Sequence, residues 1–201
     1  MMMRAIAAFA LAVLAACAST PPSRFYTLSG PPAPVTQSPG LSLVVGPVAV
    51  PAVVDRPEIV ITLGENEVWI DEFNRWAAPL ADGIGLATAQ NLGAALVTPR
   101  VTLLAQSTGG DADYRVTIEV QRFESAPGSY AMLDAVYSVR RSLDGRTVTG
   151  RTTDRQTPAD KSYDALAAAH SRAVTRLAGD IAAVVRGLST EPAPAAPSPA
   201  R

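Results

Sequence analysis

Few residues of this 201-residue chain have types and spacing that could support catalysis or metal binding. His170 is the single histidine and Cys17 the single cysteine. His170 falls within an apolar repeat, where a packed or interface imidazole is the commoner arrangement, and no partner at metal-ligand spacing accompanies it. The sequence also contains no HExxH, GxSxG, P-loop or GxGxxG motif. We therefore predict no catalytic residue, no metal site and no bound cofactor.

The acidic residues do not form a pair suited to acid–base chemistry. Asp71 and Glu72 are adjacent in a segment predicted to be extended, so their side chains point to opposite faces. Asp160 and Asp164 fall at the predicted start of a helix, where a negative charge favours the helix dipole. Serines are frequent, but none has a recognisable base. We therefore predict a structural role for Asp160 and Asp164 and a protein that is not an enzyme.

Cys17 ends a segment typical of a secretory signal. Arg4 precedes an apolar and alanine-rich run over residues 5–16, which is too short to span a bilayer as a lasting helix. Leu14-Ala15-Ala16-Cys17 is similar to a bacterial lipobox, and this resemblance implies that Cys17 is lipidated and becomes the mature N-terminus. Ala18, in place of an aspartate, implies sorting to the outer membrane. The alternatives are an ordinary signal peptide with a chance cysteine, or an uncleaved anchor.

The composition is that of a globular chain with one domain. Hydrophobic residues make up 48% and charged residues 17%, which is enough apolar material for a core. A net charge of −1 argues against a nucleic-acid binder. We predict a signal peptide over 1–16, a lipidated tether over 17–23, a single α/β domain over 24–189 and a disordered Pro/Ala-rich tail over 190–201.

Strands are predicted where β-branched and aromatic residues cluster or alternate, and where turn residues separate them. The predicted strands cover 24–28, 41–50, 58–63, 67–77, 101–105, 114–123, and a hairpin of 131–143 and 146–157 around Asp144-Gly145. Helices are predicted over 78–97 and 160–188, where apolar residues recur at spacings of three and four. This order favours an α/β two-layer sandwich, with a mostly antiparallel mixed sheet and two main helices packed on one face.

Two groups of side chains could form a binding surface. Five arginines gather on the predicted hairpin, namely Arg140, Arg141, Arg146, Arg151 and Arg155. They could form a docking face for an acidic partner or for lipid phosphates, or they could be a solvated hairpin. Trp69 and Trp76 flank the segment before the first helix. We expect both to anchor the core, although an exposed tryptophan at an oligomer interface would be a good hot spot.

Several stretches, taken in order, resemble one family. They are Arg24–Leu28, Gly46–Pro51, Val54–Val60, Arg75–Leu80 and Asn91-Leu92. Together with the lipobox they are similar to the ABC-type transport auxiliary lipoproteins, the PqiC-like family, over about residues 24–188. The resemblance implies an outer-membrane lipoprotein that faces the periplasm and is not catalytic. Its implied partners are an MCE-domain (mammalian-cell-entry) protein and an inner-membrane permease or ABC transporter, with or without an ATPase. Its implied role is to help move phospholipids or other hydrophobic molecules between membranes, and its relatives' rings imply self-assembly.

Two other functions remain compatible with an anchored α/β domain. A periplasmic lipid-binding shuttle would need an apolar cavity between the helices and the sheet. An assembly lipoprotein for lipopolysaccharide or outer-membrane proteins would share the anchor and the fold, so only its partners would differ.

Overall fold

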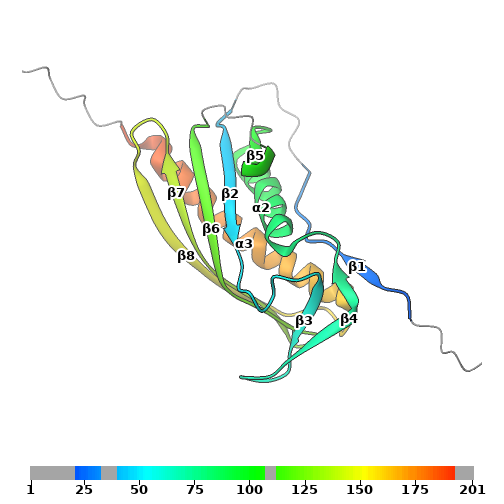
Figure 1. The fold of residues 1–201 in the computed structure, drawn as a ribbon. Coiled ribbons are helices and arrows are strands. Elements are labelled where there is room, and N and C mark those ends of the chain that lie inside the picture. The colour runs from blue at the N-terminus through cyan, green and yellow to red at the C-terminus, as the bar shows by residue number, and fades with distance from the viewer. Residues whose placement is uncertain (1–20, 33–39, 107–111, 193–201) are drawn as a thin grey trace, which may run out of the picture.

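The strands form two separate sheets, and two helices cover one face of the larger sheet (Figure 1). The computed structural model describes residues 21–32, 40–106 and 112–192. The predicted signal peptide with Cys17, most of the tether and most of the tail lie outside these residues. Within them, the α/β sandwich and the placement of both helices on one face are as predicted.

The larger sheet is mixed and has the strand order β5-β2-β6-β7-β8. Its strands are β2 (Leu43–Ala49), β5 (Val101–Leu103), β6 (Tyr114–Ala126), β7 (Tyr130–Arg141) and β8 (Thr147–Gln156). β2 is parallel to both β5 and β6, whereas β6, β7 and β8 form an antiparallel meander. A short 3₁₀ helix, η1 (Leu104–Gln106), follows β5 in place of the predicted end of that strand.

The alternation of β6 explains its place at the centre of the sheet. Val116, Ile118 and Val120 are buried against the helices, while Thr117 and Glu119 face solvent on the open side. Gly145, at a φ of 72°, turns the chain between β7 and β8 as the Asp-Gly pair predicts. The register of β2 shifts between Val45 and Val48, where Gly46-Pro47 interrupts the regular pairing.

Helices α2 (Leu80–Leu96) and α3 (Tyr163–Thr190) form the second layer. Ser162 caps α3 by accepting a hydrogen bond from the backbone N–H of Ala165 at 3.1 Å. The layer between helices and sheet is filled by fully buried apolar side chains, including Ile84, Leu92, Leu166, Leu177 and Ile181. Each such side chain contributes about 1.5–3 kcal/mol when it leaves water.

Gly85 shows why the first helix contains glycine. A Cβ atom at this position would lie 3.4 Å from both Leu103 and Val48, so the helix approaches the edge of the sheet closely. Gly83, by contrast, would have only Leu28 nearby, at 3.9 Å.

The smaller sheet has the order β1-β4-β3 and was not predicted as a separate unit. It contains β1 (Arg24–Tyr26), β3 (Glu58–Thr62) and β4 (Val68–Trp76), with β1 parallel and β3 antiparallel to β4. Glu58 pairs with Arg75, but the next residue, Ile59, pairs with Asp71. The residues between them on β4 form a bulge, and a bulge bends its strand.

The bulge divides β4 into two parts with different surroundings. The part near Trp76 pairs with β1, while the part near Trp69 pairs only with β3. In Figure 1 the β3–β4 hairpin projects beyond the end of the larger sheet. The strands thus form two sheets, whereas the sequence favoured a single sheet.

Candidate functional site

His170 lies in a buried aromatic cluster at the N-terminal half of α3. Its ring stacks on Phe123 of β6 with centroids 3.9 Å apart, and it meets the edge of Trp76 of β4 at 6.1 Å. The side chain is fully buried, and this burial lowers the pKa of His170 to about 3. His170 is therefore neutral at physiological pH.

Ser125 of β6 is the partner that sequence reasoning missed. Its Oγ lies 2.8 Å from His170 Nε2, and Ser125 is itself 1% exposed. His170 Nδ1 has no hydrogen-bond partner among the described residues, so no carboxylate orients the ring. A serine and a histidine are thus brought together, but the pair is enclosed in the core and resembles a packing element. No local sequence pattern could have paired residues on different elements.

The carboxylate of Asp71 holds the bulge of β4 and joins it to α3. It accepts hydrogen bonds from the backbone N–H groups of Phe73 and Asn74 at 2.9 and 3.0 Å, and from the Asn74 side chain. The Tyr163 hydroxyl, at the first turn of α3, also donates to it. Burial alone raises the pKa of Asp71, but these hydrogen bonds outweigh it and the net shift is downward. Asp71 therefore has a structural role, which the sequence did not predict.

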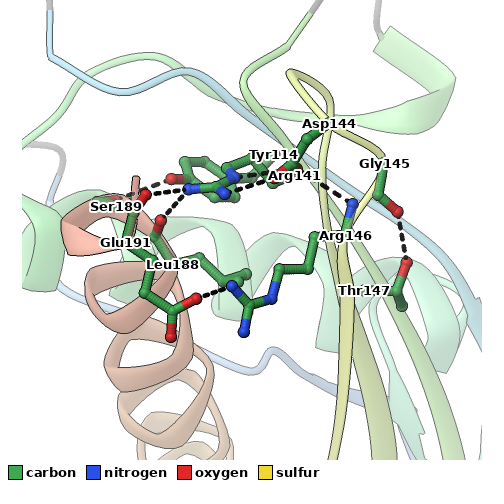
Figure 2. Close-up of polar contacts among 9 residues, drawn as sticks. All are labelled: Tyr114, Arg141, Asp144, Gly145, Arg146, Thr147, Leu188, Ser189 and Glu191. Carbon is green, nitrogen blue, oxygen red and sulfur yellow. Dashed lines mark hydrogen bonds and ion pairs between the residues drawn. The ribbon is translucent and has the colours of Figure 1, made fainter. Parts of the chain in front are cut away.

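The five arginines predicted as a partner surface have different environments, and Arg141 is the clearest case. It is 5% exposed and donates to Asp144 through both Nε and Nη2 (Figure 2). Its Nη1 donates to the backbone carbonyls of Leu188 and Glu191, at the C-terminal end of α3. Hydrogen bonds from Arg141 lower the pKa of Asp144 to about 2. Arg141 fastens the end of α3 to the β7–β8 turn and is not accessible to a partner.

Arg146 lies beside this cluster and pairs with Glu191 (Figure 2). Arg151 and Arg155 lie on the open face of the sheet, but both have intramolecular partners. Arg151 donates to the two carboxylate oxygens of Asp134 at 2.8 and 2.6 Å. The Arg155 guanidinium lies 3.6 Å above the centre of the Tyr130 ring. These partners neutralise or shield that part of the open face.

Arg140 differs from the other four because it is exposed and pairs with no described residue. In the β6–β7 register it stands directly opposite Arg115, which is half-buried and was not predicted as part of the surface. Neither guanidinium makes an ion pair within the described part of the chain. Like charges directly opposite each other on a sheet repel, so this pair would be stabilised by an anionic group placed between them.

A cleft lies between the β3–β4 hairpin and the β6–β7 turn. It encloses about 810 Å³. Its walls combine apolar side chains with polar ones at the rim, among them Val53, Val60, Val68, Phe123, Arg122, Glu124 and Tyr130. This cleft is open to solvent and lies outside the packed layer between helices and sheet.

The described residues present neither a metal centre nor a membrane span. Within residues 21–32, 40–106 and 112–192, no three His, Cys, Asp or Glu side chains are grouped so that they could hold a metal ion. No helix in the same part of the chain is both long and apolar enough to cross a membrane.

The fold therefore defines an α/β domain in which the polar groups of Asp71, His170 and Arg141 are bonded to other parts of the same domain. The model of the family described as ABC-type transport auxiliary lipoprotein component matches residues 26–182. The chain belongs to this family, as its sequence resemblance predicted. No curated protein matches it in sequence.

Two solved structures show the same fold. A crystal structure titled as an uncharacterized protein is similar with a TM-score of 0.68 at 18% identity, covering 82% of this chain and 99% of that one. Protein XCC0632 from Xanthomonas campestris, of the family DUF330, is similar with a TM-score of 0.63 at 20% identity, covering 83% and 98%. At these identities the likeness establishes the fold alone.

Proposed function

We propose that this protein is a non-catalytic accessory lipoprotein of an MCE/ABC-type transport system, anchored by Cys17 to the outer membrane and facing the periplasm. It couples an MCE-domain protein, and through it an inner-membrane permease, to the outer membrane, and the system moves phospholipids or other hydrophobic molecules. The observation that carries the proposal is the family match over residues 26–182. Energy and substrate handling belong to the partners.

The polar side chains described above are bonded within the domain, and this supports a role without catalysis. The Ser125–His170 contact is buried, and charged groups such as Asp71 and Asp134 serve to join elements of the fold. A domain of this kind acts through its surface and not through a reacting centre. Of the predicted arginine surface, Arg140 is free to take an acidic side chain of a partner, together with its neighbour Arg115 on the open sheet face.

A lipid-binding shuttle has less support. It requires an apolar cavity between helices and sheet, and that layer is filled by side chains such as Ile84, Leu166 and Leu177, which are 0% exposed. An outer-membrane assembly lipoprotein would share every structural feature described, so the identity of the co-purified partner separates it from the transport accessory.

The test is pull-down and mass spectrometry from native membranes with the full chain as bait. We expect an MCE-domain protein and a permease to be recovered. Recovery of lipopolysaccharide or outer-membrane-protein assembly factors in their place would contradict the proposal. Cys17→Ser should release the domain from the membrane without unfolding it, whereas unchanged outer-membrane fractionation would contradict the anchor.

The arginine pair can be tested in the same experiment. Removing both charges by Arg115→Gln and Arg140→Gln should lower recovery of the partner about tenfold, because two charge-assisted contacts are lost. Arg172→Gln with Arg176→Gln removes the same charge from α3 and is the matched control. Equal losses in both double variants would show that only net charge matters.

A further inference from the structure

The β3–β4 hairpin exposes an unusual amount of apolar surface. Val68, Trp69 and Ile70 follow one another on β4 and are 47%, 50% and 39% exposed, and Leu63, at the end of β3, is 58% exposed. We call these four residues the hairpin tip. Runs of exposed apolar residues are avoided in soluble domains unless they contact something, because they promote association. The expectation that Trp69 anchors the core is therefore wrong.

The hairpin tip lacks cover because of the geometry of β4. Beyond the bulge, β4 pairs only with β3, through contacts such as Ile61 with Trp69 and Thr62 with Val68. β1 pairs with β4 only from Asn74 onward. In Figure 1 the hairpin projects from the body of the domain, away from the two described helices.

The described residues just before β1 lie beside β4. β1 is parallel to β4, so the residues before Arg24 run back along β4 in the direction of the hairpin tip. Pro21 and Ser23 border the same surface groove as Ile70 and Phe73. Cys17 is four residues before Pro21, and four residues span at most about 14 Å. A lipid on Cys17 therefore lies within that span of Pro21, which borders the same groove as Ile70 of the hairpin tip.

We propose that the hairpin tip contacts the phospholipid surface in which Cys17 is anchored, with Trp69 at the level of the head groups. This inference rests on the proposed lipidation of Cys17. Tryptophan favours the membrane–water interface because its ring is apolar and its indole N–H remains hydrated. Neighbouring Val, Ile and Leu side chains add apolar area of the kind that peripheral proteins bury at that depth.

The acidic turn sets the depth and the lipid preference of the contact. Glu65 and Glu67 are exposed in the turn between β3 and β4, so the turn cannot enter the hydrocarbon region with both carboxylates charged. The contact is shallow and favours zwitterionic over anionic head groups. The contact fixes the orientation of the domain, because the end that carries Arg140 and Arg141 is at the opposite end of β7 from the β6–β7 turn beside the hairpin.

The test uses the full lipidated chain in phosphatidylethanolamine–phosphatidylcholine vesicles. Cys17 is the only cysteine, so Val68→Cys introduces a single reactive thiol once Cys17 carries lipid. An environment-sensitive fluorophore on this thiol should shift to the blue and be quenched by brominated lipid. Leu143→Cys, in the β7–β8 turn and 77% exposed, is the matched control and should show neither change.

A second measurement avoids the label. Trp76→Phe leaves Trp69 as the only tryptophan, and about half of its fluorescence should be lost to lipid brominated near the head group. Trp69→Phe leaves only the buried Trp76, which should not be quenched. Replacing much of the zwitterionic lipid by phosphatidylglycerol should weaken the quenching of Trp69.

The outcomes separate this inference from the anchor on which it rests. Vesicle flotation of wild type and Cys17→Ser reports the anchor alone. If the wild-type chain floats with vesicles but neither probe on the tip senses lipid, the membrane contact is wrong. Protection of Trp69 from an aqueous quencher without quenching by lipid would instead assign the tip to a second copy or a partner protein, which also overturns the proposal.

Discussion

The two ends of strand β4 carry the same residue type in opposite environments. Trp76 is 6% exposed and packs against Phe123 and His170, whereas Trp69, seven residues earlier, is 50% exposed. The bulge held by Asp71 lies between them and bends the strand. The difference shows that burial here is decided by which neighbours the bend brings to each half of the strand, not by the residue itself.

Trp76→Ala should cause the largest loss of stability. It removes a buried aromatic side chain from a cluster that joins β4, β6 and α3, and such a change costs about 3–5 kcal/mol. Urea unfolding followed by circular dichroism measures the effect, and Trp76→Phe should cost much less. A loss below about 1 kcal/mol would show that the two ends of β4 do not differ as described.

Tyr163→Phe should have the next largest effect, because it removes the hydrogen bond that joins α3 to the bulge. A hydrogen bond to a charged group contributes about 1.5–3 kcal/mol. The matched control is Tyr130→Phe, whose hydroxyl bonds Glu124 on the same hairpin at 3.1 Å. Equal unfolding midpoints for wild type and Tyr163→Phe would mean that the hydrogen bond from α3 does not stabilise the bulge.

His170, which packs at the buried end of β4, should make the stability of the domain sensitive to acid. Its pKa is about 3 in the folded protein and close to 6.5 when exposed, so below pH 6.5 the unfolded chain binds a proton that the folded chain does not. Stability should therefore fall as pH drops from 6.5 toward 4, by up to about 1.4 kcal/mol per pH unit. His170→Gln should flatten this dependence, and an unchanged slope in that variant would assign the effect to other groups.

Trp69→Ala should change stability least, within about 0.5 kcal/mol, because the side chain is half exposed and its part of β4 pairs only with β3. The same variant should weaken the lipid contact of the hairpin tip, so stability and membrane contact separate at this residue. A loss near that of Trp76→Ala would place Trp69 in the core and remove the contrast.

The arginines of the β7–β8 hairpin, like the two tryptophans, are buried or exposed according to their neighbours in the fold. Arg140 and Arg141 are neighbours in sequence, yet Arg141 is buried against Asp144 and the end of α3 while Arg140 is exposed beside Arg115. Alternation along β7 places them on opposite faces. The five arginines in the sequence indicated a basic hairpin. Only their partners in the fold show which of them is accessible to another molecule.

The sequence by itself determined the elements, the family and the fold class. Strict alternation in residues 114–123 and the apolar stripe of residues 160–188 are local patterns, and local periodicity is sufficient to predict a strand and a helix. The motifs from Arg24 to Leu80 were sufficient to identify the family, because their order and spacing are read along the chain.

Only the tertiary structure decided the contacts between distant elements. The division into two sheets, the contact of Ser125 with His170, the closure of Arg141 onto α3 and the exposure of Trp69 each depend on residues far apart in sequence. The bend at residues 72–74 is one such case. The Asp71 carboxylate accepts hydrogen bonds from the nearby backbone of Phe73 and Asn74 and also from Tyr163, 92 residues away. No local sequence pattern can specify the contact with Tyr163.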